Sequence, residues 1–222
     1  DTSPDLIYKN INRKRRIVFI IALAATVVAF LLDICVGSSG MSPIGVIETL
    51  IAGPNGDEVN TLIIRSIRLP MTVTSVFVGA SLALAGLQVQ TITNNPLSSP
   101  YTLGISAGAS FGAAISITLG ISVMGIQWIG TSLMAFIFAI GVSLSIFFIG
   151  KKRGMGASIL ILTGIIMNFF FTALQQYLQY SASAEIAQII SNWSFGNLSR
   201  ASWTSATVGG VIFIIGYILL RG

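Results

Sequence analysis

The chain has 222 residues, of which 54% are hydrophobic and only 9% are charged, and its formal net charge is +5. Soluble domains carry about 25% charged residues, so this composition excludes a water-soluble globular fold. It predicts an all-α protein that crosses the membrane several times, because each helix satisfies its own backbone hydrogen bonds in lipid. Histidine is absent and Cys35 is the single cysteine, which excludes an intrachain disulfide and removes the most common metal ligand.

Six apolar runs predict six membrane-spanning helices, since a helix needs about 17–25 apolar residues to cross about 30 Å of hydrocarbon. We place these helices at residues 17–36, 70–92, 102–122, 127–150, 157–180 and 203–220. The connecting segments 37–64 and 181–202 each contain a pattern typical of a further short helix. The predicted fold is therefore polytopic and helical, with two structured connections.

Basic residues orient these helices in the membrane. They concentrate before the first helix, between the fourth and the fifth, and after the sixth, at Lys9, Arg13, Lys14, Arg15, Arg16, Lys151, Lys152, Arg153 and Arg221. With six crossings, all of these positions lie on one side, which the positive-inside rule makes cytoplasmic. We therefore expect a cytoplasmic N-terminus. Topology explains the basic balance of the chain, and no nucleic acid is expected as a partner.

Small residues recur at four-residue spacing in the second and third predicted helices. Gly104, Gly108 and Gly112 lie on one face of the third helix, and Gly79 and Gly86 on the second helix are their candidate counterparts. Such spacing lets two helix backbones approach closely. Helix packing explains this glycine ridge better than contact with a transported solute does.

Between these two helices, the segment Asn95-Pro96-Leu97-Ser98-Ser99-Pro100 must leave the helical conformation. Proline cannot donate a backbone hydrogen bond, and it disfavours helix at the residue before it. Non-helical backbone at membrane depth occurs only where it is buried in protein or lines a watery cavity. The residues allow this interpretation and an ordinary cytoplasmic turn equally well.

A polar stripe follows one face of the fifth predicted helix. Its members are spaced by four, three and four residues, and a glycine continues the face toward the cytoplasm: Gly164, Asn168, Thr172, Gln175 and Gln179. Hydrogen bonds between helices could account for the stripe. The functional interpretation is a solvated pathway, because uncharged polar groups can contact a passing solute without trapping it.

Nothing in the sequence indicates catalysis. It contains no Walker A motif and no HExxH helix, so we expect no catalytic residues, no metal site and no cofactor. Asp33 is the one acidic residue within a predicted span, and its position near the interface favours snorkelling. Uphill transport would therefore draw on a partner protein, and a gradient-driven carrier, which usually holds buried carboxylates, is less favoured.

Several motifs together closely resemble the FecCD family, the permeases of ABC importers for ferric siderophores, haem and vitamin B12. They are Arg68-Leu69-Pro70, the run of small residues and leucines at 79–86, Gln90, Asn95-Pro96-Leu97, Pro100 and Leu103-Gly104, with Trp193, Gly196 and Trp203 as a second match. The resemblance extends from about residue 40 onward. It implies a transport protein that is not itself an enzyme.

The resemblance also implies an assembly. Residues 1–222 would form a single permease domain, the first six helices of a family fold with about ten, truncated before the loop that couples to the ATPase. The implied partners are a second permease subunit, identical or different, two cytoplasmic ABC ATPases, and a periplasmic or lipid-anchored binding protein. The implied location is the inner or plasma membrane of a prokaryote.

Site residues follow from the resemblance position by position. Arg68 matches an arginine that binds the substrate-binding protein, Met71 stands where a second arginine is usual, and Arg65 is a candidate substitute. Asn95, Pro96 and Leu97 match one segment of a cytoplasmic gate, and Ala157 and Ser158 lie where the second gate segment is found. The family pathway is lined largely by the helix that carries the polar stripe. The competing interpretations are a secondary transporter or channel with broken helices and, weakest, an intramembrane enzyme.

Overall fold

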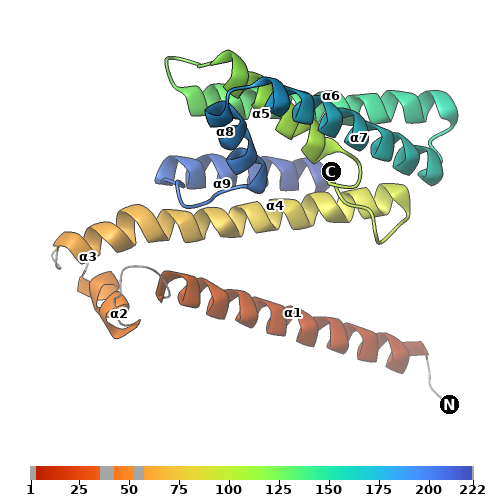
Figure 1. The fold of residues 1–222 in the computed structure, drawn as a ribbon. Coiled ribbons are helices and arrows are strands. Elements are labelled where there is room, and N and C mark those ends of the chain that lie inside the picture. Colours follow the sequence, from red (N-terminus) through yellow and green to blue (C-terminus); the bar gives the residue numbers. More distant parts are fainter. Residues whose placement is uncertain (1–3, 36–42, 53–57, 222) are drawn as a thin grey trace. The chain divides into compact units, whose positions relative to one another are not determined.

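The computed structural model of the chain describes residues 4–35, 43–52 and 58–221 (Figure 1). Within these residues the regular elements are helices, apart from a single bridge between Val123 and Ile126. The elements are α1 Pro4–Cys35, α2 Pro43–Ala52, α3 Glu58–Leu62, the π-helix η2 Ile63–Arg68, α4 Leu69–Thr93, α5 Ile105–Leu119, α6 Gln127–Arg153, α7 Ala157–Ser181, α8 Ala184–Phe195 and α9 Trp203–Arg221. The all-α fold is confirmed, and α2 and α8 lie in the two connecting segments where a short helix is predicted.

Among the residues that the structure describes, five helical stretches are long and apolar enough to cross a membrane, at Ile11–Cys35, Val59–Thr93, Gln127–Arg153, Ala157–Ser181 and Trp203–Arg221. The span predicted at 102–122 differs, because helix α5 has only 15 residues. Residues 100–104 form a turn before this helix starts, and Gly120 ends it in a left-handed conformation with φ 64°. Glycine adopts that conformation without steric cost and is a common helix stop.

The chain divides into two compact units. The first unit comprises residues 1–78 and 198–215, and the second comprises residues 79–197 and 216–222. In the first unit, Ile34 of α1, Val46 of α2 and Ile64 of η2 form a small buried cluster. This cluster holds the short helix α2 against the end of α1.

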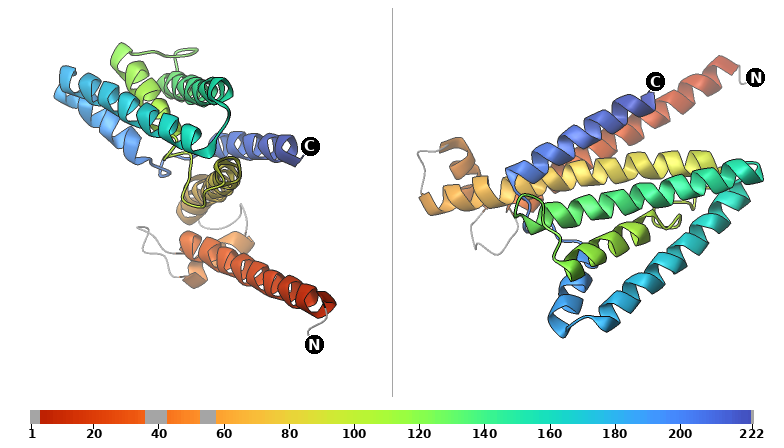
Figure 2. Two further views of the ribbon diagram at one scale, coloured as in Figure 1. Left: turned by 90° about the vertical axis from the view of Figure 1, so that its right-hand side faces the viewer. Right: turned by 90° about the horizontal axis from the view of Figure 1, so that it is seen from above.

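In the second unit, α5 packs against α6, α7 and α8. Figure 2 (right) shows α6 and α7 as two arms that meet near residues 154–156, with α5 between them. Leu103, Val142, Ile146 and Leu160 form one buried cluster near the meeting point of the arms. Toward their open end, Ala114 and Ile117 of α5 pack on Ile190 of α8.

The glycine ridge of α5 packs against α6, and the expected counterpart on α4 is wrong. A Cβ added to Gly112 would lie 2.5 Å from the Met134 carbonyl oxygen of α6, and one added to Gly108 would collide with Val142. At Gly79 and Gly86 an added Cβ would meet no atom within 4 Å among the described residues. Four-residue spacing of small residues permits close approach but does not choose the partner helix, so the sequence could not identify α6.

The second predicted span does not begin at residue 70, because the helix continues through Pro70 back to Glu58. The π-helix η2 makes this possible, since the Leu69 N–H bonds to the Ile64 carbonyl, five residues back. In this register the next N–H, at position 70, would serve the Arg65 carbonyl, but proline has none. The Trp203 indole Nε1 donates to that carbonyl instead, at 2.9 Å. Interfacial anchoring alone would explain a tryptophan at position 203. The structure adds a second role, because its indole supplies the donor that the Arg65 carbonyl of η2 lacks.

Replacing Trp203 by phenylalanine is expected to destabilise the protein by about 0.5–1.5 kcal/mol, because the Arg65 carbonyl loses its donor. Thermal unfolding of the purified protein measures the effect. Trp128→Phe is the matched control, since Trp128 is similarly exposed, 59% against 50% for Trp203, and its indole makes no hydrogen bond to a described residue. Equal unfolding temperatures for the two variants would contradict the assignment.

Candidate functional site

The connecting turn, residues 94–104, links α4 to α5 and is held by its own polar side chains. Asn94 has φ 44°, in the left-handed region. The Asn95 side-chain oxygen accepts from the Leu97 N–H at 2.9 Å, and Gln90 Nε2 donates to the Pro96 carbonyl at 3.0 Å. Asparagine commonly stabilises turns in this way. The Asn-Pro-Leu motif is therefore a defined turn, with the Leu97 side chain 83% exposed.

The second half of the connecting turn leads into α5. The Ser99 N–H donates to Thr102 Oγ1 at 2.8 Å, and the Thr102 N–H donates to Ser99 Oγ at 3.2 Å. Gly104 then precedes the first residue of α5, with φ 73°. This reciprocal pair of bonds fixes the chain where two prolines prevent a regular helix.

The connecting turn is docked on α7 by two glycines. A Cβ at Gly104 would lie 2.6 Å from the Asn168 backbone nitrogen, and one at Gly164 would lie 2.7 Å from the Leu103 Cα. Asn168 Nδ2 donates to the Tyr101 carbonyl at 3.0 Å. The Thr172 hydroxyl donates to Asn168 Oδ1 at 3.3 Å, which orients the amide. Residues predicted separately for packing and for the pathway thus form one contact.

Beside this contact lies an open hollow of about 540 Å³, here called the polar hollow. Its lining comes from the connecting turn and from α7, at Asn95, Leu97, Ser98, Tyr101, Thr102, Ile161, Ile165, Asn168, Phe169 and Thr172. None of these side chains is charged. The turn whose role the residues left undecided therefore lines a hollow together with the first half of the polar stripe.

The second half of the polar stripe lies elsewhere. Gln175 Nε2 donates to Ser194 Oγ at 2.9 Å, and Gln179 Nε2 donates to Ser191 Oγ at 3.0 Å. Both serines belong to α8. Hydrogen bonding between helices accounts for these two glutamines. Sequence reasoning missed the serines, although their three-residue spacing places them on one face of a short predicted helix.

Ala157 and Ser158 occupy the first turn of α7. The nearest residue of α7 that lines the polar hollow is Ile161, one turn further on. The two gate segments implied by the resemblance therefore flank the same end of α7, and only the Asn-Pro-Leu segment reaches the hollow in this structure.

The two arginines of the first unit have different environments. Arg68 is 7% exposed, and its Nη1 donates to the Ile34 carbonyl at 3.4 Å. Arg65 is half-buried, and its Nε has no hydrogen-bond partner among the described residues. Asp33 Oδ2 accepts from the Thr72 hydroxyl at 2.6 Å. Sequence reasoning did not foresee this partner of Asp33, because Thr72 carries no signal beyond its place on α4.

In residues 4–35, 43–52 and 58–221, no three His, Cys, Asp or Glu side chains gather as a metal ion would require. The polar hollow offers hydroxyl and amide groups on a largely apolar wall.

Comparison with known proteins decides the family. The model of the FecCD transport family matches residues 25–221. The chain belongs to the FecCD transport family. It is therefore a membrane-embedded member of a permease family, as its motifs imply.

Individual proteins similar to this chain are named as permeases. A Methanocaldococcus jannaschii protein named as an ABC transporter permease is 36% identical over 93% of the chain, which covers 61% of that protein. The Fe(3+)-citrate import system permease protein of Bacillus subtilis is 30% identical over 94% of the chain, which covers 60% of that protein. The chain thus spans about three fifths of the length of these relatives.

A solved structure supports the fold. The protein, described as a metal-chelate type ABC transporter in an inward-facing conformation, matches with a TM-score of 0.73 and 28% identity. The match covers 90% of this chain and 59% of that one.

Proposed function

We propose that this chain belongs to the transmembrane permease of an ABC importer for an iron chelate, haem or corrinoid, and that the polar hollow is the cytoplasmic end of its pathway. The assignment of the polar hollow to the pathway depends on one observation: the connecting turn and the polar stripe of α7 line the same hollow. Family membership and the B. subtilis ferric citrate permease support the first part. Among the three cargo classes, this relative favours an iron chelate.

The topology of the second unit is consistent with a cytoplasmic position for the polar hollow. Ile92 and Thr93, just before the connecting turn, share a hollow with Met155 and Leu160, which flank the start of α7. The turn therefore lies at the same end of the helices as the basic residues 151–153. The positive-inside rule favours the cytoplasm for that end and, independently, for the basic residues 9–16 near the N-terminus.

The proposed mechanism assigns this chain shape and gating rather than chemistry. A loaded binding protein would dock on the external face, and ATP binding by two cytoplasmic ATPases would rearrange the helices. The solute would then pass beside α7, between this chain and a second permease subunit. Uncharged hydroxyl and amide groups along the hollow can exchange hydrogen bonds with the solute without holding it.

Uptake into proteoliposomes tests the proposal. The complete transporter, reconstituted with its ATPase and binding-protein partners, is expected to accumulate ferric citrate or a ferric siderophore only when ATP is supplied. Haem and cobalamin, supplied separately, distinguish the other cargo classes. Uptake that requires a proton or sodium gradient and ignores both ATP and vanadate would show a secondary transporter instead.

The difference between the two arginines leads to a prediction about docking. Arg65→Glu is expected to weaken the affinity for the binding protein with little change in stability, because this side chain is only half-buried and its Nε has no hydrogen-bond partner among the described residues. Arg68→Gln is expected to lower the unfolding temperature, since it removes a buried charged donor worth about 1.5–3 kcal/mol. Binding to the immobilised binding protein and thermal unfolding measure the two effects. Unchanged binding by the Arg65 variant would rule out its docking role.

A further inference from the structure

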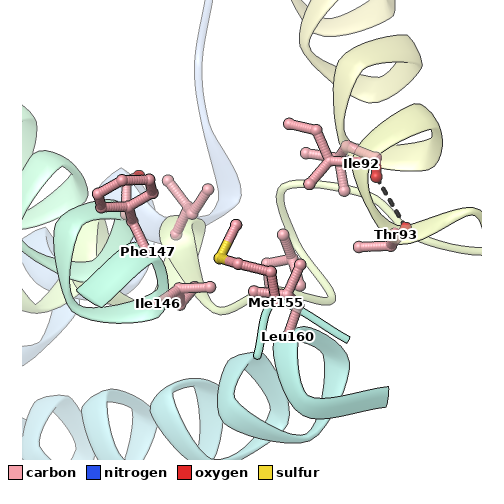
Figure 3. A pocket seen from close by; sticks show the side chains of 10 residues that line it. Ile92, Thr93, Ile146, Phe147, Met155 and Leu160 are labelled. Carbon is pink, nitrogen blue, oxygen red and sulfur yellow. Dashed lines mark hydrogen bonds between the residues drawn. The ribbon is translucent and has the colours of Figure 1, made fainter. Parts of the chain in front are cut away.

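A second hollow, here called the apolar hollow, lies in the second unit where α4, α5, α6 and α7 come together (Figure 3). Its volume is about 190 Å³. The polar side chains in its lining are Thr93 and Ser143. Their hydroxyls already donate to carbonyls of their own helices, at 2.7 Å for Thr93 and 2.9 Å for Ser143. Water would find few partners here, so the hollow suits an apolar occupant.

The loop between α6 and α7 presents Met155 to this hollow. Gly154 and Met155 both have left-handed backbone conformations, with φ 95° and 53°. For methionine this is an uncommon conformation that costs free energy. Figure 3 shows the Met155 side chain between Ile146 and Phe147 on one side and Ile92 on the other. Because methionine is unbranched and flexible, it can move aside and remain in contact with an inserted chain.

Positive charge lies directly beside the apolar hollow. The basic segment, residues 151–153, ends α6 between the lining residues Phe147 and Met155, and all three of its side chains are exposed. Lys151 follows Phe147 by four residues and therefore lies one turn further on the same helix face. The sequence has no aspartate or glutamate between Glu58 and Glu185. The helices that surround this segment therefore supply no carboxylate to balance its charge.

From this combination we infer a binding site for one anionic phospholipid. Part of one acyl chain occupies the apolar hollow against Met155 and Phe147, and the phosphate lies at the basic segment. Basic residues beside a gap between membrane helices are typical of lipid headgroup sites. A phospholipid matches both features, since it carries an apolar chain and a negative charge on one molecule. The inference does not depend on the transported cargo or on the polar hollow.

Native mass spectrometry of the assembled transporter, purified with added phosphatidylglycerol or phosphatidylcholine, tests the charge requirement. The wild-type transporter is expected to retain phosphatidylglycerol in preference. The triple variant Lys151→Gln, Lys152→Gln, Arg153→Gln is expected to lose this preference. A matched control, Lys14→Gln, Arg15→Gln, Arg16→Gln, removes three exposed charges from α1 and is expected to keep it. Equal loss in both variants would mean a general surface effect and would overturn the proposal.

A second variant tests the apolar hollow. Ser143→Phe adds bulk to the lining from an exposed position, and it is expected to reduce retention of both lipids. Ser145→Phe is its control, because Ser145 lies on the same helix outside the lining and bonds in the same way to the carbonyl four residues back. Unchanged retention in Ser143→Phe would overturn the proposal. If the basic-segment variant keeps its lipid but loses copurifying ATPase subunits, the segment binds a protein and the proposal is wrong.

Discussion

Replacing Gly164 by alanine is expected to abolish uptake and to destabilise the protein. The new Cβ would lie 2.7 Å from both the Cα and the Cδ2 of Leu103, and backbone cannot move aside as a flexible side chain can. Overpacking of this kind costs about 1–3 kcal/mol. The connecting turn would be displaced from α7, and the polar hollow would lose its shape. Solute uptake and thermal unfolding of the purified transporter measure the two consequences.

Gly104→Ala probes the same contact from the other side. Its Cβ would meet the Asn168 backbone at 2.6 Å, and its φ of 73° is unfavourable for alanine. Gly141→Ala is the matched control, because a Cβ there would meet no atom within 4 Å among the described residues. It is expected to leave uptake unchanged and to stabilise α6 slightly. If the variants at positions 104 and 164 behave like this control, the docking of the turn on α7 is wrong.

Replacing Asn168 by leucine is expected to reduce uptake while the protein still folds. The Tyr101 carbonyl would lose its donor, a loss of about 0.5–1.5 kcal/mol. If the turn alternates between a state docked on α7 and an undocked state, loss of this bond shifts the equilibrium between them by about two- to tenfold. Leucine has the same branching and the same number of side-chain heavy atoms as asparagine but no polar group, and position 168 is only half-buried, so the protein is expected to fold. Initial uptake rates in vesicles, normalised to the amount of folded protein, measure the effect.

Gln175→Leu is the matched control for that variant. Gln175 lies on the same helix face, carries the same amide and bonds to Ser194 outside the polar hollow. Its loss is expected to affect stability and not the rate of uptake. If the two leucine variants reduced uptake equally, the assignment of only the first half of the stripe to the pathway would be wrong.

The sequence was sufficient where one physical rule acts alone. Apolar length places five of the six predicted membrane helices, the exception being the short helix α5. The period of an α-helix places the members of the polar stripe on one face of α7. The prolines at 96 and 100 predict that the chain leaves the helix between α4 and α5. These expectations depend on the backbone and on local spacing.

Predictions failed where a tertiary partner decides the outcome. Pro70 was expected to begin a helix, but the π-register of η2 and the Trp203 indole together accommodate it. The glycine ridge packs on α6, a choice that depends on the shape of the facing helix. The polar stripe divides into two halves because α8 supplies two serines to its second half. None of these partners is close in sequence to the residue it serves.

Thiol accessibility of Thr172 tests most directly whether the polar hollow is part of the pathway. In a Cys35→Ser background, Thr172→Cys is compared with Ile166→Cys on the same helix, which is 58% exposed and lies outside the hollow. The assembled transporter is treated with a membrane-impermeant, water-soluble thiol reagent, with and without ATP. The account predicts faster modification at position 172 than at position 166, and a rate at 172 that changes with ATP. Slow, ATP-independent modification at position 172, equal to that at 166, would contradict it.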